Sequence, residues 1–138
     1  GRPEIEVAAV LAMAEAKTAA LLAASTSIGA VLAGAPAASV EALAEYGRHL
    51  GLAFQLVDDV LGIWGEPAVT GKPARSDLRS RKTSLPVARV IGLGGAAAAE
   101  VTAWLGAEDE AGEDLLKRIA EVVEEAGGRD WARQEAAR

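Results

Sequence analysis

The fold class is decided by residues 40–63, VEALAEYGRHLGLAFQLVDDVLGI. At 100° per residue, the apolar side chains of this stretch cover more than half of a helical wheel, which predicts a largely buried helix. Because glycine has no side chain, we expect open space beside the adjacent carboxylates of Asp58 and Asp59. The polar arc is then either a solvated stripe or the wall of a cleft for a hard cation such as magnesium. Its residues are Gly51, Gln55, Asp58, Asp59 and Gly62.

The rest of the chain also has the pattern of helices separated by turns. The 138 residues contain no alternating strand pattern, internal repeat or linker, so an all-α fold is predicted. Ser39 is expected to be the N-cap of the helix at 40–63. A polar loop is expected at 64–77. The other helices are expected from Glu4 to about Gly34, from Ser84 to Gly94, from there to Gly106, at 113–126 and at 129–138.

Composition excludes several functional classes. The net charge of -6 argues against a general nucleic-acid binder. The chain has no cysteine for a disulfide or thiolate site, and its single histidine, His49, excludes a multi-histidine zinc site. An uncharged run at 18–40 is diluted by serine, threonine and glycine and interrupted by Pro36. It therefore favours a buried helix of a soluble bundle over a membrane span.

Lys17 is unusual because it shares its wheel direction with apolar residues such as Leu21 and Ile28. A buried ammonium group needs a partner. Either the long stem of Lys17 lets its head reach solvent, or an anion arrives with a substrate. Thr18 offers a hydroxyl group beside it.

A cluster of cations follows the polar loop. Within eleven residues, five basic side chains surround one acid, Asp77, which gives a local charge of +4. The cluster is a solvated patch, an RNA contact or a diphosphate cradle, and Gly71 would let the backbone approach an anion closely. Together with the carboxylate pair and Lys17, it suits magnesium plus an oligophosphate. The basic residues are Lys72, Arg75, Arg79, Arg81 and Lys82.

Residues 54–86, FQLVDDVLGIWGEPAVTGKPARSDLRSRKTSLP, closely resemble the second aspartate-rich region of the trans-isoprenyl (polyprenyl) diphosphate synthases. The dipeptide Lys17–Thr18 matches the family's lysine–threonine on an earlier helix, and GGRDWARQEA at 127–136 is similar to its closing helix. The resemblance implies the C-terminal portion of an all-α isoprenoid-synthase bundle. It also implies a magnesium-dependent prenyltransferase that condenses an allylic diphosphate with isopentenyl diphosphate.

The same resemblance implies a role for particular residues. Asp58 would bind magnesium directly, with Asp59 in support. The diphosphate would be bound by Lys17, Lys72 and Lys82. The catalytic and cation-positioning residues would be Lys17, Thr18, Phe54 and Gln55.

Two features depart from the family pattern. Gly62 stands where the motif DDxxD has its last aspartate, and the first aspartate-rich motif is absent from these residues. We therefore expect residues 1–138 to be the C-terminal half of a single synthase domain about twice as long, and the isolated chain to be inactive. The alternative is an impaired or regulatory homologue or subunit that binds prenyl diphosphate without turnover. The acidic residues at 108–110 and 113–114 are expected to be solvated caps.

The resemblance also gives expectations about partners and location. Family members are usually homodimers, so a cytoplasmic homodimer is expected, without nucleic acid and without stable membrane insertion. Some relatives with the DDVLG variant are thought to travel as encapsulin cargo. An encapsulin shell is therefore a further expected partner by resemblance.

Overall fold

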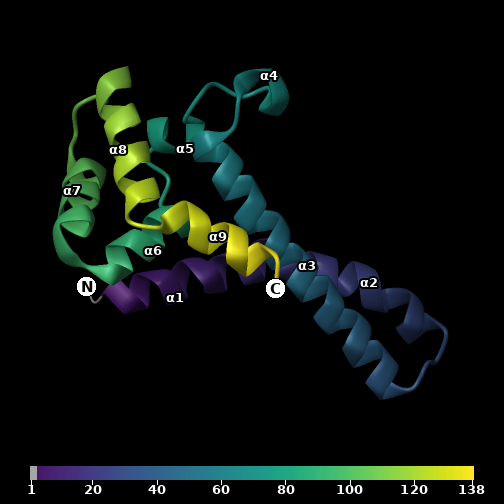
Figure 1. Cartoon of the computed structure of the whole chain (residues 1–138). Helices are drawn as coiled ribbons and strands as arrows, with labels where there is room; N and C mark the ends of the chain where they lie inside the picture. The colour runs from purple at the N-terminus through teal and green to yellow at the C-terminus, as the bar shows by residue number, and fades with distance from the viewer. Residues whose placement is uncertain (1–2) are drawn as a thin grey trace. The chain divides into compact units, whose positions relative to one another are not determined.

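A computed structural model describes residues 3–138, apart from the side chains of residues 3–7. Every regular element among the described residues is helical (Figure 1), which confirms the all-α fold class. The elements are α1 (Pro3–Ala14), the π-helical turn η1 (Glu15–Ala19), α2 (Ala20–Leu32), α3 (Ala37–Trp64), α4 (Pro67–Thr70), α5 (Ser76–Arg79), α6 (Leu85–Leu93), α7 (Gly95–Gly106), α8 (Glu113–Glu125) and α9 (Gly128–Ala136).

The chain forms two compact units. One unit, here called the hairpin unit, consists of Leu11–Gln55. The other, here called the core unit, contains the residues up to Val10 and those from Leu56 onward. The boundary falls inside α3, so the last part of that helix, with both aspartates, belongs to the core unit.

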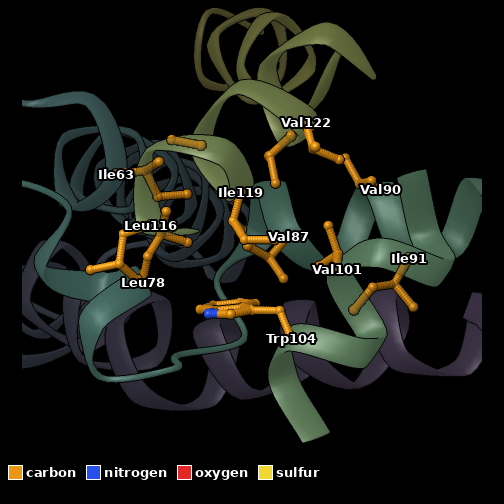
Figure 2. Packing of buried hydrophobic residues seen from close by; sticks show 12 residues of the cluster. Ile63, Leu78, Val87, Val90, Ile91, Val101, Trp104, Leu116, Ile119 and Val122 are labelled. Atoms are coloured by element: carbon orange, nitrogen blue, oxygen red, sulfur yellow. The ribbon is translucent and has the colours of Figure 1, made fainter. Parts of the chain in front are cut away.

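The core unit is built around buried branched side chains of α6, α7 and α8. On α8, Leu116, Ile119 and Val123 follow helical spacing and are all fully buried. Figure 2 shows Leu116 and Ile119 in one cluster with Val87 of α6 and Val101 of α7, and Trp104 lies beneath Val87. Burial of one such side chain contributes about 1.5–3 kcal/mol. Leu78 of α5 is part of the same buried cluster, so this packing also holds the segment that precedes α6 in place.

The hairpin unit is packed through small residues instead. Ala19 is fully buried, and a Cβ placed on Gly51 would lie 2.5 Å from the Cα atom of Ala19. Thr26 Oγ1 also donates a hydrogen bond to the carbonyl oxygen of Leu43 at 2.6 Å. The glycine is therefore needed because the two helices approach closely. The prediction that Gly51 leaves open space is wrong.

The prediction of a largely buried helix at 40–63 is wrong for one face. Leu56 and Ile63 are buried, whereas Phe54 is 64% exposed. The apolar stripe that includes Lys17 is likewise exposed, and so is Lys17 itself. Within the described residues these faces are not covered by another element. Exposed apolar side chains of these helices also include Met13, Leu21, Ile28, Leu50, Val57 and Leu61.

Helix boundaries differ from the prediction at two places. Helix α3 begins at Ala37, because the carbonyl oxygen of Pro36 accepts hydrogen bonds from the N–H groups of Ser39 and Val40. Ser39 therefore lies inside the helix and is not its N-cap. The predicted loop at 64–77 contains the short helix α4 and the start of α5.

By length and composition alone, the helical stretch Ala8–Leu32 could cross a membrane. This is weak evidence, since a core helix of a soluble protein passes the same test. Only 17% of its most apolar window is buried, so the predicted burial of this run is wrong within the described chain.

Candidate active site

Asp59 is a buried carboxylate whose two oxygens both accept hydrogen bonds. It is 2% exposed. Its Oδ1 accepts from Lys82 Nζ at 2.8 Å, and its Oδ2 accepts from the backbone N–H of Leu85 at 2.8 Å. Leu85 is the first residue of α6, and the N-cap Ser84 makes no side-chain cap bond. Asp59 therefore caps α6 from α3 and joins that helix to the segment that carries Lys82.

Asp58, one residue earlier, is the accessible carboxylate of the pair. Its side chain is 41% exposed, and its Oδ1 lies 3.7 Å from Lys72 Nζ. An ion pair at this exposure contributes little to stability. Asp58 can therefore exchange this contact for another cation without much cost to the fold.

Lys72 reaches Asp58 because of the turn that precedes it. Helix α4 starts with Pro67 in its first turn and ends at Thr70, and its C-cap Gly71 has a φ of 69°. Glycine adopts this left-handed conformation without a steric penalty. The backbone N–H of Lys72 then donates a hydrogen bond to Thr70 Oγ1 at 3.2 Å, and the Lys72 side chain extends to Asp58 of α3.

Lys82 lies between two carboxylates, Asp59 of α3 and Asp77 of α5. Its Nζ is 2.8 Å from Asp59 Oδ1 and 3.5 Å from Asp77 Oδ2. Burial alone lowers the pKa of Lys82, but the hydrogen bond with Asp59 and the charges of the three aspartates outweigh it and raise this pKa above 10.5. Burial raises the pKa of Asp77 above 3.8 despite the nearby lysine. Lys82 is therefore a permanently charged ammonium group.

The three aspartates and two lysines of this cluster carry one net negative charge. Such a balance suits a divalent cation that arrives with an anion. Among the described residues, however, no group of three or more His, Cys, Asp or Glu side chains could hold a metal ion by itself. Magnesium often binds through one or two carboxylates plus substrate phosphates. The donor set fits that arrangement and not a metal cage made by the protein alone.

The arginines of the basic loop have a different task from its lysines. Arg75 Nη2 lies 3.1 Å from Glu113 Oε2, and Arg79 binds the other oxygen of Glu113. The hydrogen bond from Arg79, which has the larger effect, and that from Arg75 lower the pKa of Glu113 below 4.5. Arg81 donates to the carbonyl oxygens of Trp104 and Asp109. The three arginines therefore anchor the loop to α7 and α8. Glu113 is exposed in the first turn of α8, in line with the prediction, but it also pairs with two arginines.

The hairpin unit holds the other residues singled out by the sequence. Lys17 and Thr18 lie in η1, a π-helical turn of a kind that is frequent at functional sites. Thr18 Oγ1 donates a hydrogen bond to Gln55 Oε1 at 3.2 Å. Phe54 is the residue before Gln55 on α3, and its ring is exposed. The structure thus brings Thr18 and Gln55 together, as one pair within this unit.

Four predicted residues, Asp58, Asp59, Lys72 and Lys82, form one cluster in the core unit. Sequence reasoning missed the part played by Asp77 and Glu113. Asp77 was visible as the single acid among five basic residues, which is the only signal that could have drawn attention to it. The partner of Glu113 could not be foreseen, because it depends on how α5 packs against α8.

The sequence profile of the polyprenyl synthetase family matches residues 2–123, and the chain belongs to this family. It is 55% identical, over 99% of its length, to a (2E,6E)-farnesyl diphosphate synthase of Mycobacterium tuberculosis, of which it covers 39%. The resemblance inferred from residues 54–86 is therefore confirmed.

Solved structures agree with this assignment. A polyprenyl synthetase from Streptomyces coelicolor matches 95% of the chain with a TM-score of 0.88 and 48% identity, over 40% of its own length. A geranylgeranyl pyrophosphate synthase from Corynebacterium glutamicum, complexed with isoprenyl diphosphate and magnesium, matches 95% of the chain with a TM-score of 0.81 and 32% identity, over 38% of its own length. The chain thus spans about two fifths of the length of the relatives it matches.

Proposed function

We propose that residues 1–138 are the C-terminal part of a magnesium-dependent polyprenyl diphosphate synthase. The whole protein would condense an allylic diphosphate with isopentenyl diphosphate to make a longer prenyl diphosphate. The observation that carries this proposal is the cluster of Asp58, Asp59, Lys72, Asp77 and Lys82 at the end of α3. Family membership and a relative complexed with isoprenyl diphosphate and magnesium support it.

In this reaction the C–O bond of the allylic diphosphate breaks, leaving inorganic diphosphate and an allylic cation. The double bond of isopentenyl diphosphate then forms a new C–C bond with the cation, and a proton is lost. Bound magnesium supplies positive charge that stabilises the leaving diphosphate. Lys72 and Lys82 add two fixed positive charges to the same task.

The two aspartates have different parts in the proposal. Asp58 is the group that would hold magnesium, because its carboxylate is accessible and pairs with the exposed side chain of Lys72. Asp59 supports the site by position, since its two oxygens hold Lys82 and the start of α6. Lys17, Thr18, Phe54 and Gln55 would bind the allylic diphosphate and stabilise the cation.

The test is product formation by the longest natural protein that contains these residues, with isopentenyl diphosphate and a series of allylic primers. We expect elongated prenyl diphosphates that require magnesium. Asp58→Ala should lower kcat by about 100-fold or more, the scale of losing one stabiliser of a developing charge. Lys72→Ala should mainly raise the KM of the allylic substrate, while Lys117→Ala, at an exposed lysine of α8, is the matched control.

Failure to form product with any primer would contradict prenyl transfer. Binding of a prenyl diphosphate without turnover by that protein would favour the regulatory homologue instead. An unchanged rate of Asp58→Ala at limiting magnesium would contradict the metal assignment alone.

We infer from the same resemblance that the protein is a cytoplasmic homodimer without nucleic acid or stable membrane insertion. Recovery in the soluble fraction without detergent, a dimeric mass in light scattering and no RNA binding at low salt are the expected results. Association with an encapsulin shell stays a prediction, to be tested by co-purification with shell particles.

A further inference from the structure

Helix α9 faces the last turns of α3 across a cavity. The cavity has a volume of about 260 Å³. It is lined by apolar side chains of both helices and by two arginines of α9: Leu56, Val57, Val60, Leu61, Arg129, Ala132, Arg133 and Ala136. Side chains that border such a space lack part of the close contacts that fix a packed interface. On this side, therefore, close packing alone does not fix the direction of the last turns of α3.

Arg129 of α9 contacts the end of α3 beside this cavity. Its guanidinium carbon lies 5.4 Å from the centre of the Trp64 ring, and Trp64 is the last residue of α3. A cation over the face of a tryptophan ring is attracted by the electrons of that ring. The last turn of α3 has no basic residue of its own. Arg129 therefore also places a positive charge near the negative end of this helix.

Arg129 is itself held by α8 and by the start of α9. Its Nη1 atom lies 2.7 Å from Glu124 Oε1 of α8. The preceding residue, Gly128, is buried, and a Cβ placed on it would lie 3.0 Å from the carbonyl oxygens of Pro86 and Val123. Since the first turn of α9 approaches α6 and α8 so closely, it cannot shift without moving their backbones. Arg129 thus acts on Trp64 from a fixed position.

The contact leaves two buried donors without a partner. Within the described chain, neither Arg129 Nε nor Trp64 Nε1 makes a hydrogen bond. A buried donor without an acceptor is unfavourable. Hydrogen bonding therefore does not explain why these two side chains meet, whereas stacking and charge do. Local departures of this kind are expected where a residue serves function rather than stability.

We propose that Arg129 is a positioning residue for the metal-binding end of α3. It acts through Trp64: the stacked guanidinium group fixes the direction of the last turns of α3 and thereby that of the Asp58 carboxylate. The role toward magnesium rests on the proposed function, whereas the effect of Arg129 on the order of these turns does not. The two effects are therefore measured separately.

The order of α3 is tested by hydrogen–deuterium exchange with mass spectrometry, in the longest natural protein that contains these residues and without diphosphate. We expect Arg129→Ala to exchange the amides of residues 56–64 several-fold faster, with peptides of α7 unchanged, since only the end of α3 loses a contact. Arg129→Lys should do the same, because lysine keeps the charge but has no planar group to stack. Arg133→Ala, at an exposed residue one turn later that lines the same cavity, is the matched control.

The positioning role is tested by calorimetric titration with inorganic diphosphate, with and without magnesium. Arg129→Ala should weaken the magnesium-dependent part of binding several-fold and leave binding without magnesium unchanged, because the metal needs Asp58 in a fixed direction. A purely structural loss would weaken both. The melting temperature of each variant confirms that it is folded at the temperature of the titration.

Several results would overturn the proposal. Unchanged exchange in Arg129→Ala, or full rescue by Arg129→Lys, would exclude the ring contact as the source of order. Unchanged magnesium-dependent binding, equal weakening with and without magnesium, or the same changes in Arg133→Ala would exclude a positioning role. If the wild type itself binds no diphosphate, the proposed function and the role of Arg129 toward magnesium fail together, while the exchange still decides whether Arg129 orders α3.

Discussion

The core unit and the hairpin unit bury different kinds of side chain. The core unit encloses a cluster of isoleucine, leucine and valine with Trp104. The hairpin unit buries Ala14, Ala19 and Ala23, while large apolar side chains such as Leu32, at 83% exposure, lie on its surface. Buried apolar area stabilises the core unit, whereas the packing of the hairpin unit depends on the close approach of its helices at glycine.

This difference separates two ways of positioning a functional residue. In the core unit, the packed helices α6–α8 give fixed anchoring points to the loop that carries Lys72, Asp77 and Lys82. In the hairpin unit, Thr18 meets Gln55 because Ala19 and Gly51 bring the two helices together. Changes in the core should therefore affect stability most, and changes at the helix contact should affect the Thr18–Gln55 pair.

The largest expected effect is that of a cavity in the core unit. Leu116→Ala should lower the free energy of unfolding by about 2–5 kcal/mol, since it removes methyl groups from a fully buried site. Leu32→Ala, at an exposed site of the hairpin unit, should change it by less than about 0.5 kcal/mol. Urea unfolding of both variants measures the contrast, and equal losses would contradict it.

A smaller effect is expected at the close contact of the hairpin unit. Gly51→Ala places a Cβ against the backbone of Ala19 and should cost about 1–3 kcal/mol by overpacking. Gly29→Ala, in open space on α2, should instead stabilise the helix by up to about 1 kcal/mol. Chemical denaturation monitored by circular dichroism tests the pair, and a neutral Gly51→Ala would refute the close approach.

The smallest effect concerns the exposed contact of Glu113 with Arg75 and Arg79. Because the folded pKa of Glu113 is lowered, its contribution to stability is present above pH 4.5 and is lost as the pH falls through the folded pKa. The stability difference between wild type and Glu113→Gln should therefore be largest near neutral pH and shrink in acid. The exposed Glu110→Gln is the control, and a difference that does not vary with pH would exclude this ion pair as its source.

The sequence was sufficient for the all-α class, the family and the cluster at the end of α3. Helical periodicity and the order of turn residues determine most of the helices, and the spacing of Asp58, Lys72 and Lys82 matches the family. Burial was predicted poorly, because a helical wheel shows which residues share a face but not which element covers it. For this reason the wheel did not reveal that the faces of Phe54 and Lys17 are exposed.

The roles of the glycines and arginines also could not be predicted from spacing. Gly62 was expected to border open space, yet its neighbour is Asp77, fifteen positions later in the chain. In the sequence, the arginines at 75, 79 and 81 could not be distinguished from the two lysines of the same basic cluster. Only the packing of α5 against α8, and of Arg81 against the end of α7, distinguishes structural cations from those that face the aspartates.

The central claim is that Asp58 provides the metal-binding carboxylate while Asp59 holds the site together. The direct measurement is calorimetric titration of Asp58→Asn and Asp59→Asn with inorganic diphosphate, with and without magnesium, together with the melting temperature of each. We predict that Asp58→Asn melts like wild type but loses the magnesium-dependent part of diphosphate binding, whereas Asp59→Asn melts at a clearly lower temperature. Magnesium-dependent binding that survives in Asp58→Asn, or an unchanged melting temperature in Asp59→Asn, would contradict this division of roles.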